Sequence, residues 1–224
     1  MRYAKSIILT ITMCLGFAGA ASAQMGMRPP QIPGEFKPVV GSGAQYEISS
    51  KKDAKMDMAY AIVGKESVDG ADGYWMEIRM LSGKGEGMVM KQLMVMSSET
   101  PGIKRMIMQM PGRPPMEMPM GMMSGMMKNM PKHSAAEGGP SHGMGEKVGT
   151  EMVTVPAGTF LCDHYRSQSQ HGTADIWIST KVAPYGLVKM TSEDTTMDLE
   201  KVLTNETSQI KGEPQKMNFP GMPH

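Results

Sequence analysis

Cysteine is scarce in this chain of 224 residues, which contains only Cys14 and Cys162. Cys14 lies in an N-terminal segment where two basic residues precede an apolar run over residues 7–17. The run leads to Ala-Ser-Ala, so the segment is typical of a secretory signal peptide (1–23) cleaved after Ala23. Lipidation of Cys14 is the alternative, but the apolar run continues beyond it. Cleavage leaves Cys162 alone, so no intramolecular disulfide can form and the fold must depend on a packed core.

The chain also lacks a large excess of positive or negative charge, and it has no long apolar run after its N-terminal segment. Removing residues 1–23 takes away two basic residues and no acidic ones, so the formal net charge falls from +1 to −1. This balance gives no electrostatic reason to expect nucleic acid as a partner. No later segment reaches the roughly 18 apolar residues that a membrane-spanning helix needs. We therefore expect a soluble, secreted protein, which would be periplasmic in a Gram-negative bacterium.

Catalytic motifs are absent as well. The chain has no G-x-S-x-G, no G-x-x-x-x-G-K-[ST] and no H-E-x-x-H, and no pair of carboxylates in a recognisable setting. The sequence therefore favours a protein that is not an enzyme.

Leucine is rare, whereas methionine is abundant: the chain has eight Leu and 29 Met. Many methionines follow strand periodicity. For example, Tyr74, Met76, Ile78 and Met80 alternate with Trp75, Glu77 and Arg79. Methionine is therefore the usual large aliphatic residue of this chain. We expect these residues, and the alternating set Met58, Tyr60 and Ile62, to face the core.

Glycine-bearing turns separate short candidate strands throughout the chain. The predicted strands are 45–51, 56–65, 73–81, 87–97, 103–110, 147–155, 159–168, 173–180, 186–192 and 195–206. Ten strands joined by hairpin connections predict a mainly β fold, either a curved antiparallel sheet or an open half-barrel. We expect an irregular Pro-rich arm (24–42), a single β domain (43–210) and a flexible tail (211–224).

One compositional break interrupts the strands at residues 111–146. Pro111, Pro114, Pro115 and Pro119 remove backbone donors and oppose a regular strand. A Met-rich loop or a short helix over 119–130 is expected next, followed by a Gly/Ser-rich linker.

The methionines of this insertion allow three interpretations. They can form an adaptable apolar lid or docking surface for an apolar small molecule, a lipid or an envelope protein. The residues concerned are Met116, Met118, Met120, Met122, Met123, Met126, Met127 and Met130. A different interpretation is structural filling in an envelope protein that has no small-molecule ligand. No cofactor is expected for either of these two interpretations.

The remaining interpretation is that the methionines bind copper, because thioether sulfur is a soft, neutral ligand that suits Cu(I). The candidate ligands are Met116, Met118, Met120, Met123, Met127, Met130, His133, His142, Cys162 and His164. Cys162 and His164 are two residues apart in a predicted strand, so their side chains share a face. The simpler alternative is that Cys162 faces the core while His164 lies near the sheet's edge.

Four segments carry a resemblance to a known group of proteins. They are VGKESVDGADGYWMEI (63–78), VPAGTFLCDHYR (155–166), ADIWIST (174–180) and APYGLVKM (183–190). Together they resemble bacterial exported domains of unknown function that are distantly similar to the lipoprotein-carrier (LolA/LolB-like) superfamily. The resemblance implies a curved antiparallel sheet that holds an apolar cavity under helical or loop lids. It fixes no ligand-contacting residue. The prediction is therefore an exported, non-enzymatic binding protein, with Cu(I) binding or a structural role as alternatives.

Overall fold

The computed structural model describes residues 34–51, 55–81, 87–96, 102–119, 145–169 and 172–216. The chain divides into two units, residues 1–31 and 32–224. All described residues belong to the second unit. Within the described ranges there is no helix, and thus no helix that could span a membrane.

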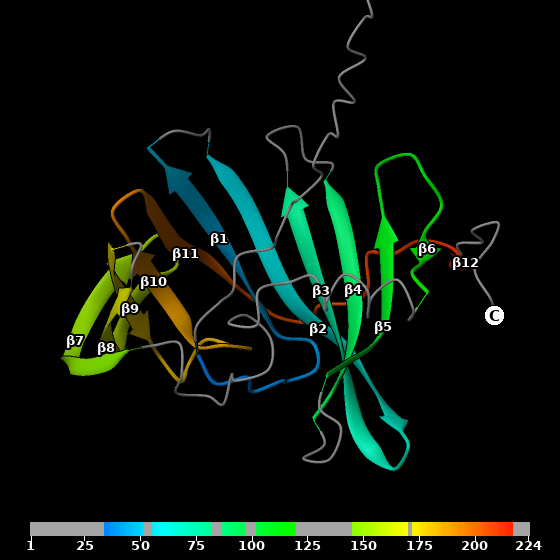
Figure 1. The fold of residues 1–224 in the computed structure, drawn as a ribbon, viewed down its shortest axis with the longest axis horizontal. Helices are drawn as coiled ribbons and strands as arrows, with labels where there is room; N and C mark the ends of the chain where they lie inside the picture. Colours follow the sequence, from blue (N-terminus) through cyan, green and yellow to red (C-terminus); the bar gives the residue numbers. More distant parts are fainter. Residues whose placement is uncertain are drawn as a thin grey trace, which may run out of the picture. The chain divides into compact units, whose positions relative to one another are not determined.

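The described residues form one open sheet of twelve strands (Figure 1). In chain order the strands are β1 (Gly43–Ser50), β2 (Met56–Val68), β3 (Ala71–Leu81), β4 (Met88–Val95), β5 (Gly102–Gln109), β6 (Met116–Glu117), β7 (Glu146–Val155), β8 (Gly158–Ser169), β9 (Gly172–Ile178), β10 (Leu187–Thr191), β11 (Thr195–Leu203) and β12 (Gln215–Lys216). Their order across the sheet is β12-β6-β5-β4-β3-β2-β1-β11-β10-β9-β8-β7. Only β12 and β6 are parallel; every other neighbouring pair is antiparallel.

The predicted fold class is confirmed, because all ten expected strands are present. Two further strands, β6 and β12, have two residues each. β6 lies inside the predicted insertion, between Pro115 and Pro119, and β12 lies inside the predicted tail. The short helix expected over 119–130 falls almost entirely outside the described residues.

Local backbone conformation explains the tightest hairpin of the sheet. β2 and β3 are joined by Asp69 and Gly70, and Val68 lies directly opposite Ala71. Both turn residues have positive φ, 52° at Asp69 and 80° at Gly70. A two-residue turn of this handedness matches the twist of the flanking strands, and Asp-Gly is among the pairs that tolerate it.

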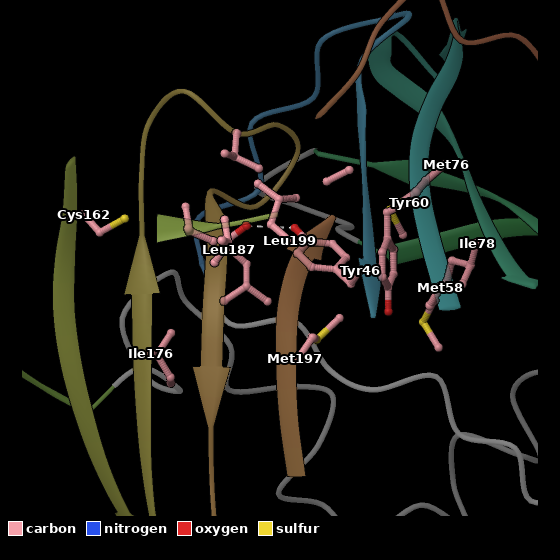
Figure 2. Close-up of a cluster of buried hydrophobic side chains, with 14 of the residues drawn as sticks. Tyr46, Met58, Tyr60, Met76, Ile78, Cys162, Ile176, Leu187, Met197 and Leu199 are labelled. Carbon is pink, nitrogen blue, oxygen red and sulfur yellow. Dashed lines mark hydrogen bonds between the residues drawn. The ribbon is translucent and has the colours of Figure 1, made fainter. Parts of the chain in front are cut away.

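The inner face of the sheet carries the main core (Figure 2). Its buried residues come from β1–β3, β7–β11 and the connection between β9 and β10, so the face curves around a single cluster. Met58 and Met76 belong to it, which confirms that these methionines are core residues. The Tyr46 hydroxyl donates a hydrogen bond to the Leu187 carbonyl oxygen at 3.0 Å. Removal from water raises the pKa of Tyr46, so the hydroxyl stays protonated.

The chain's own side chains fill the centre of this inner face. The connection between β9 and β10, residues 179–186, brings Val182 into the core. The Tyr185 ring contacts Phe36 and Tyr60, with ring centroids 5.3 and 6.2 Å away. Space for a ligand on the inner face must therefore be sought away from this centre.

The outer face is covered over β3–β5 by the segment that follows β11, residues 204–214, which we call the C-terminal strap. Trp75, Leu93 and Ile107 form a second core there, and Ile210 of the strap packs against it. The Lys211 amide donates to the Gln109 side-chain oxygen at 2.9 Å. The strap then continues into β12, beside β6 (Figure 1).

Candidate functional site

Methionines from three strands form one row at the β6 end of the inner face. Directly opposed residues of an antiparallel pair present their side chains on the same face. Ile78 belongs to the inner core, and Met90 lies opposite it on β4. Met108 lies opposite Met90, and Met116 lies opposite Met108. Register alone therefore brings three thioethers into line.

A second row runs beside the first. Met106 lies opposite Gln92, and the Met118 amide donates to the Met106 carbonyl oxygen at 2.9 Å, which extends the ladder past β6. Met88 lies opposite Met80 on the other side of the first row. The surface made by these two rows and Met88, here called the methionine face, consists of Met88, Met90, Met106, Met108, Met116 and Met118.

Burial distinguishes the methionine face from the three fully buried methionines of the core, Met58, Met76 and Met197. All six residues of the face are half-buried. Met58 and Met197, in contrast, are almost completely removed from solvent. The face is therefore an apolar surface at which sulfur remains partly accessible, as it does at Met56, Met80, Met94 and Met190 on the margin of the core.

The first residues of the Met-rich segment are held in place from the outer side. Arg105 donates two hydrogen bonds to the Glu117 carboxylate, at 2.7 and 3.2 Å. These hydrogen bonds hold the pKa of Glu117 below its usual value. The Gln215 amide donates to the carbonyl oxygen of the buried Pro115 at 2.9 Å. Side-chain and backbone bonds thus fix β6, with Met116 on its inner side.

The structure describes only some of the predicted lid and copper-ligand residues. Met116 and Met118 belong to the methionine face. Met120, Met122, Met123, Met126, Met127, Met130, His133 and His142 lie outside the described residues. Sequence analysis did not propose Met88, Met90, Met106 or Met108 as site residues. The signal that links them to Met116 is strand register, which composition does not contain.

Cys162 and His164 occupy β8, near the opposite end of the sheet. Eight strands lie between β8 and β6 in the sheet order, so this pair and Met116 are not neighbours in the sheet. Cys162 is fully buried in the inner core. Burial, with smaller effects of Asp163 and Glu151, raises the pKa of its thiol to about 11. The thiol is therefore protonated at neutral pH.

His164 is occupied by neighbouring side chains. Its Nε2 atom lies 2.7 Å from Asp175 Oδ1, and its Nδ1 atom lies 3.1 Å from Glu151 Oε1. The imidazole also stacks on Trp177, with ring centroids 4.5 Å apart and an angle of 19° between the planes. These contacts join β7, β8 and β9, which gives His164 a structural role.

We expect Cys162, in protein expressed as residues 24–224, to resist thiol reagents while the protein is folded. At pH 8, less than about a tenth of the thiol should react with Ellman's reagent in the time that labels it fully in guanidinium chloride, because thiolate is the reactive form. A Met152→Cys variant is the positive control, since Met152 is 62% exposed. Rapid stoichiometric labelling of the native protein would contradict the buried position of Cys162.

Three carboxylates form a second group of potential ligands, which sequence analysis did not identify. Oxygen atoms of Glu47, Asp57 and Glu200 lie within 4.8 Å of one another. Lys55 Nζ lies 2.6 Å from Glu47 Oε1, and this contact lowers the pKa of Glu47. A lysine thus already compensates part of the negative charge, and the group is a salt-bridged surface of β1, β2 and β11.

Comparison with known proteins identifies structural neighbours only. No protein-family model matches the chain, and no curated protein shows significant sequence similarity to it. One solved structure is that of a protein assigned as a lipoprotein from Parabacteroides distasonis, which is 15% identical with a TM-score of 0.38. It covers 77% of this chain and 100% of its own. Another is a protein from Bacteroides fragilis assigned as exported, with a YmcC-like fold. It is 12% identical with a TM-score of 0.38 and covers 76% of this chain and 99% of its own. At this level of similarity neither neighbour assigns a function to the chain, and the link to the lipoprotein-carrier superfamily stays a prediction.

Proposed function

We propose that this chain is an exported, non-enzymatic binding protein whose methionine face takes an apolar ligand such as a lipid or another long-chain molecule. The observation that carries the proposal is the alignment of Met90, Met108 and Met116 in one half-buried row. Unbranched thioether side chains adapt to ligands of varied shape. The filled centre of the inner face favours this end of the sheet over an enclosed cavity. The lid formed by the rest of the Met-rich segment stays a prediction.

The proposal is tested by placing a charge in the row. We expect Met108→Lys to weaken binding of cis-parinaric acid, a fluorescent long-chain fatty acid, at least tenfold, because the ammonium would need to lose water beneath an apolar ligand. Met152→Lys is the matched control, since Met152 is exposed on β7, far from the face in the sheet order. Fluorescence titration of the mature protein gives the Kd of each variant. Equal Kd values for the two variants would contradict the proposal.

Cu(I) binding is a second candidate, supported by the same row of neutral, soft sulfur ligands. A variant with Met90→Leu, Met106→Leu, Met108→Leu and Met116→Leu, the four-leucine variant, separates the two candidates because leucine keeps the apolar surface and removes the sulfur. Parinarate binding that survives these changes supports the apolar ligand. Stoichiometric Cu(I) uptake against bathocuproine disulfonate, lost in the same variant, would support copper instead. Absence of both activities would favour a purely structural role.

A further inference from the structure

We propose that the methionine face is a site of oxidative modification by hypohalous acids, and that its oxidation releases the apolar ligand. This inference rests on the proposed function for the ligand and adds a means of controlling it. The observations behind it are the half-buried state of the face, the repetition of sulfur within it, and the full burial of Met58, Met76 and Met197 in the neighbouring core.

The chemistry at each thioether is a two-electron oxidation. The sulfur lone pair attacks the chlorine of HOCl and the O–Cl bond breaks. Water then adds to the chlorosulfonium ion, and chloride and protons leave. The net reaction converts one thioether and one HOCl into one sulfoxide, one chloride and one proton. Sulfur loses two electrons, and chlorine gains them.

Exposure determines which methionines can react. Met152 and Met96, which are 62% and 49% exposed, should react first but lie outside the face. The half-buried residues of the face should follow, as should the half-buried Met56, Met80, Met94, Met110 and Met190 outside it. Met58, Met76 and Met197 are 0%, 2% and 1% exposed, so an oxidant that cannot enter the core should leave them intact.

The row geometry makes the modification effective. A sulfoxide is polar and strongly hydrated, so it disrupts an apolar surface that a thioether helps to form. Met108 has a methionine directly opposite it on each side, Met90 and Met116. A sulfoxide at Met108 therefore places a hydrated oxygen in the middle of the row. Leucine would provide the same apolar surface without this sensitivity, yet the directly opposed positions 90, 108 and 116 all carry methionine.

The experiment treats the mature protein with increasing HOCl, quenches it, and measures parinarate binding and sulfoxide positions by peptide mass spectrometry. We expect binding to weaken at least tenfold as sulfoxide forms at Met90, Met106, Met108 and Met116, and not when only Met96 and Met152 are oxidised. The four-leucine variant should lose less affinity on oxidation, relative to its own untreated Kd, than the native chain does. A variant with Met96→Leu and Met152→Leu should stay sensitive. Methionine sulfoxide reductases should restore binding to the oxidised native chain.

Three results separate the two proposals. Failure of the untreated protein to bind parinarate overturns the proposed function and the release with it. Binding that persists when the four positions carry sulfoxide overturns the release alone. A loss of affinity on oxidation of the four-leucine variant as large as that of the native chain, with Met88 and Met118 unoxidised, also overturns it, because the sensitive residues would then lie outside the methionine face.

Discussion

Replacing Arg79 by methionine is expected to lower the free energy of unfolding by about 3–5 kcal/mol, because it leaves a buried carboxylate without its counter-charge. Arg79 is 3% exposed, and its Nη2 atom lies 3.1 Å from the Oε2 atom of the fully buried Glu77. The same guanidinium pairs with Glu206 and donates to the Thr207 carbonyl oxygen at 3.0 Å. One side chain thus holds two carboxylates and a backbone carbonyl, and it joins the outer face of β3 to the C-terminal strap.

The strap should detach in this variant before the sheet unfolds. Glu77 also accepts hydrogen bonds from the Ser208 hydroxyl and the Gln209 amide. Both members of the Glu77–Arg79 pair therefore bind the C-terminal strap to β3. Urea denaturation gives the change in free energy, and hydrogen exchange of residues 206–211 reports on the strap. Adding Glu77→Gln to Arg79→Met should recover part of the loss, since the unpaired charge is then removed.

Lys51→Met is the matched control for this change, because it removes a surface ion pair. Lys51 Nζ lies 3.8 Å from Asp194 Oδ1, and both side chains are largely exposed. Exposed pairs of this kind contribute between nothing and about 1 kcal/mol. A loss at Arg79 no larger than the loss at Lys51 would show that the buried pair does not hold the strap.

The sheet could be predicted from sequence because its ten long strands carry their signals locally. Alternation within β2 and β3, and the Asp69-Gly70 turn between them, lie within a few residues of one another. β6 and β12 have no such signal. Each has only two residues, and their pairing joins Met116 to Gln215 across about a hundred residues of chain. That partnership depends on where the strap ends, which no local pattern encodes.

The burial of the outer face was not predictable for a related reason. Trp75, Glu77 and Arg79 alternate with the core residues of β3, which by itself indicates a solvent-facing set. They are buried because the strap returns over them, and its Ser208 is 131 residues from Glu77. A charged residue in an alternating strand can be recognised as buried only after its distant partner has been placed.

The candidate site shows the same division between local and distant information. Sequence composition identified the Met-rich segment and therefore Met116 and Met118. It could not identify Met106 or Met108 as their neighbours, because that depends on the register of β5 against β4 and β6. For Cys162 and His164, the two-residue spacing could not distinguish a metal pair from a core thiol beside a salt-bridged imidazole. The Asp175 and Glu151 partners of His164 come from separate strands.

Changing Met58 to alanine should lower the free energy of unfolding by about 2–5 kcal/mol, because it opens a cavity in the inner core. Met58 is fully buried, lies between Tyr46 on β1 and Met80 on β3, and belongs to the main cluster. Met58→Leu should cost less than about 1.5 kcal/mol, since its volume is similar. The difference between the two variants, measured by urea denaturation, tests whether methionine serves as an ordinary aliphatic residue in the core. A Leu variant as unstable as the Ala variant would mean that the shape or sulfur of Met58 is itself required. Met58, whose sulfur is enclosed, is expected to tolerate replacement by leucine, whereas Met108, whose sulfur is half-exposed, is expected to be sensitive to oxidation. The same residue type therefore contributes packing at one position and chemical reactivity at the other.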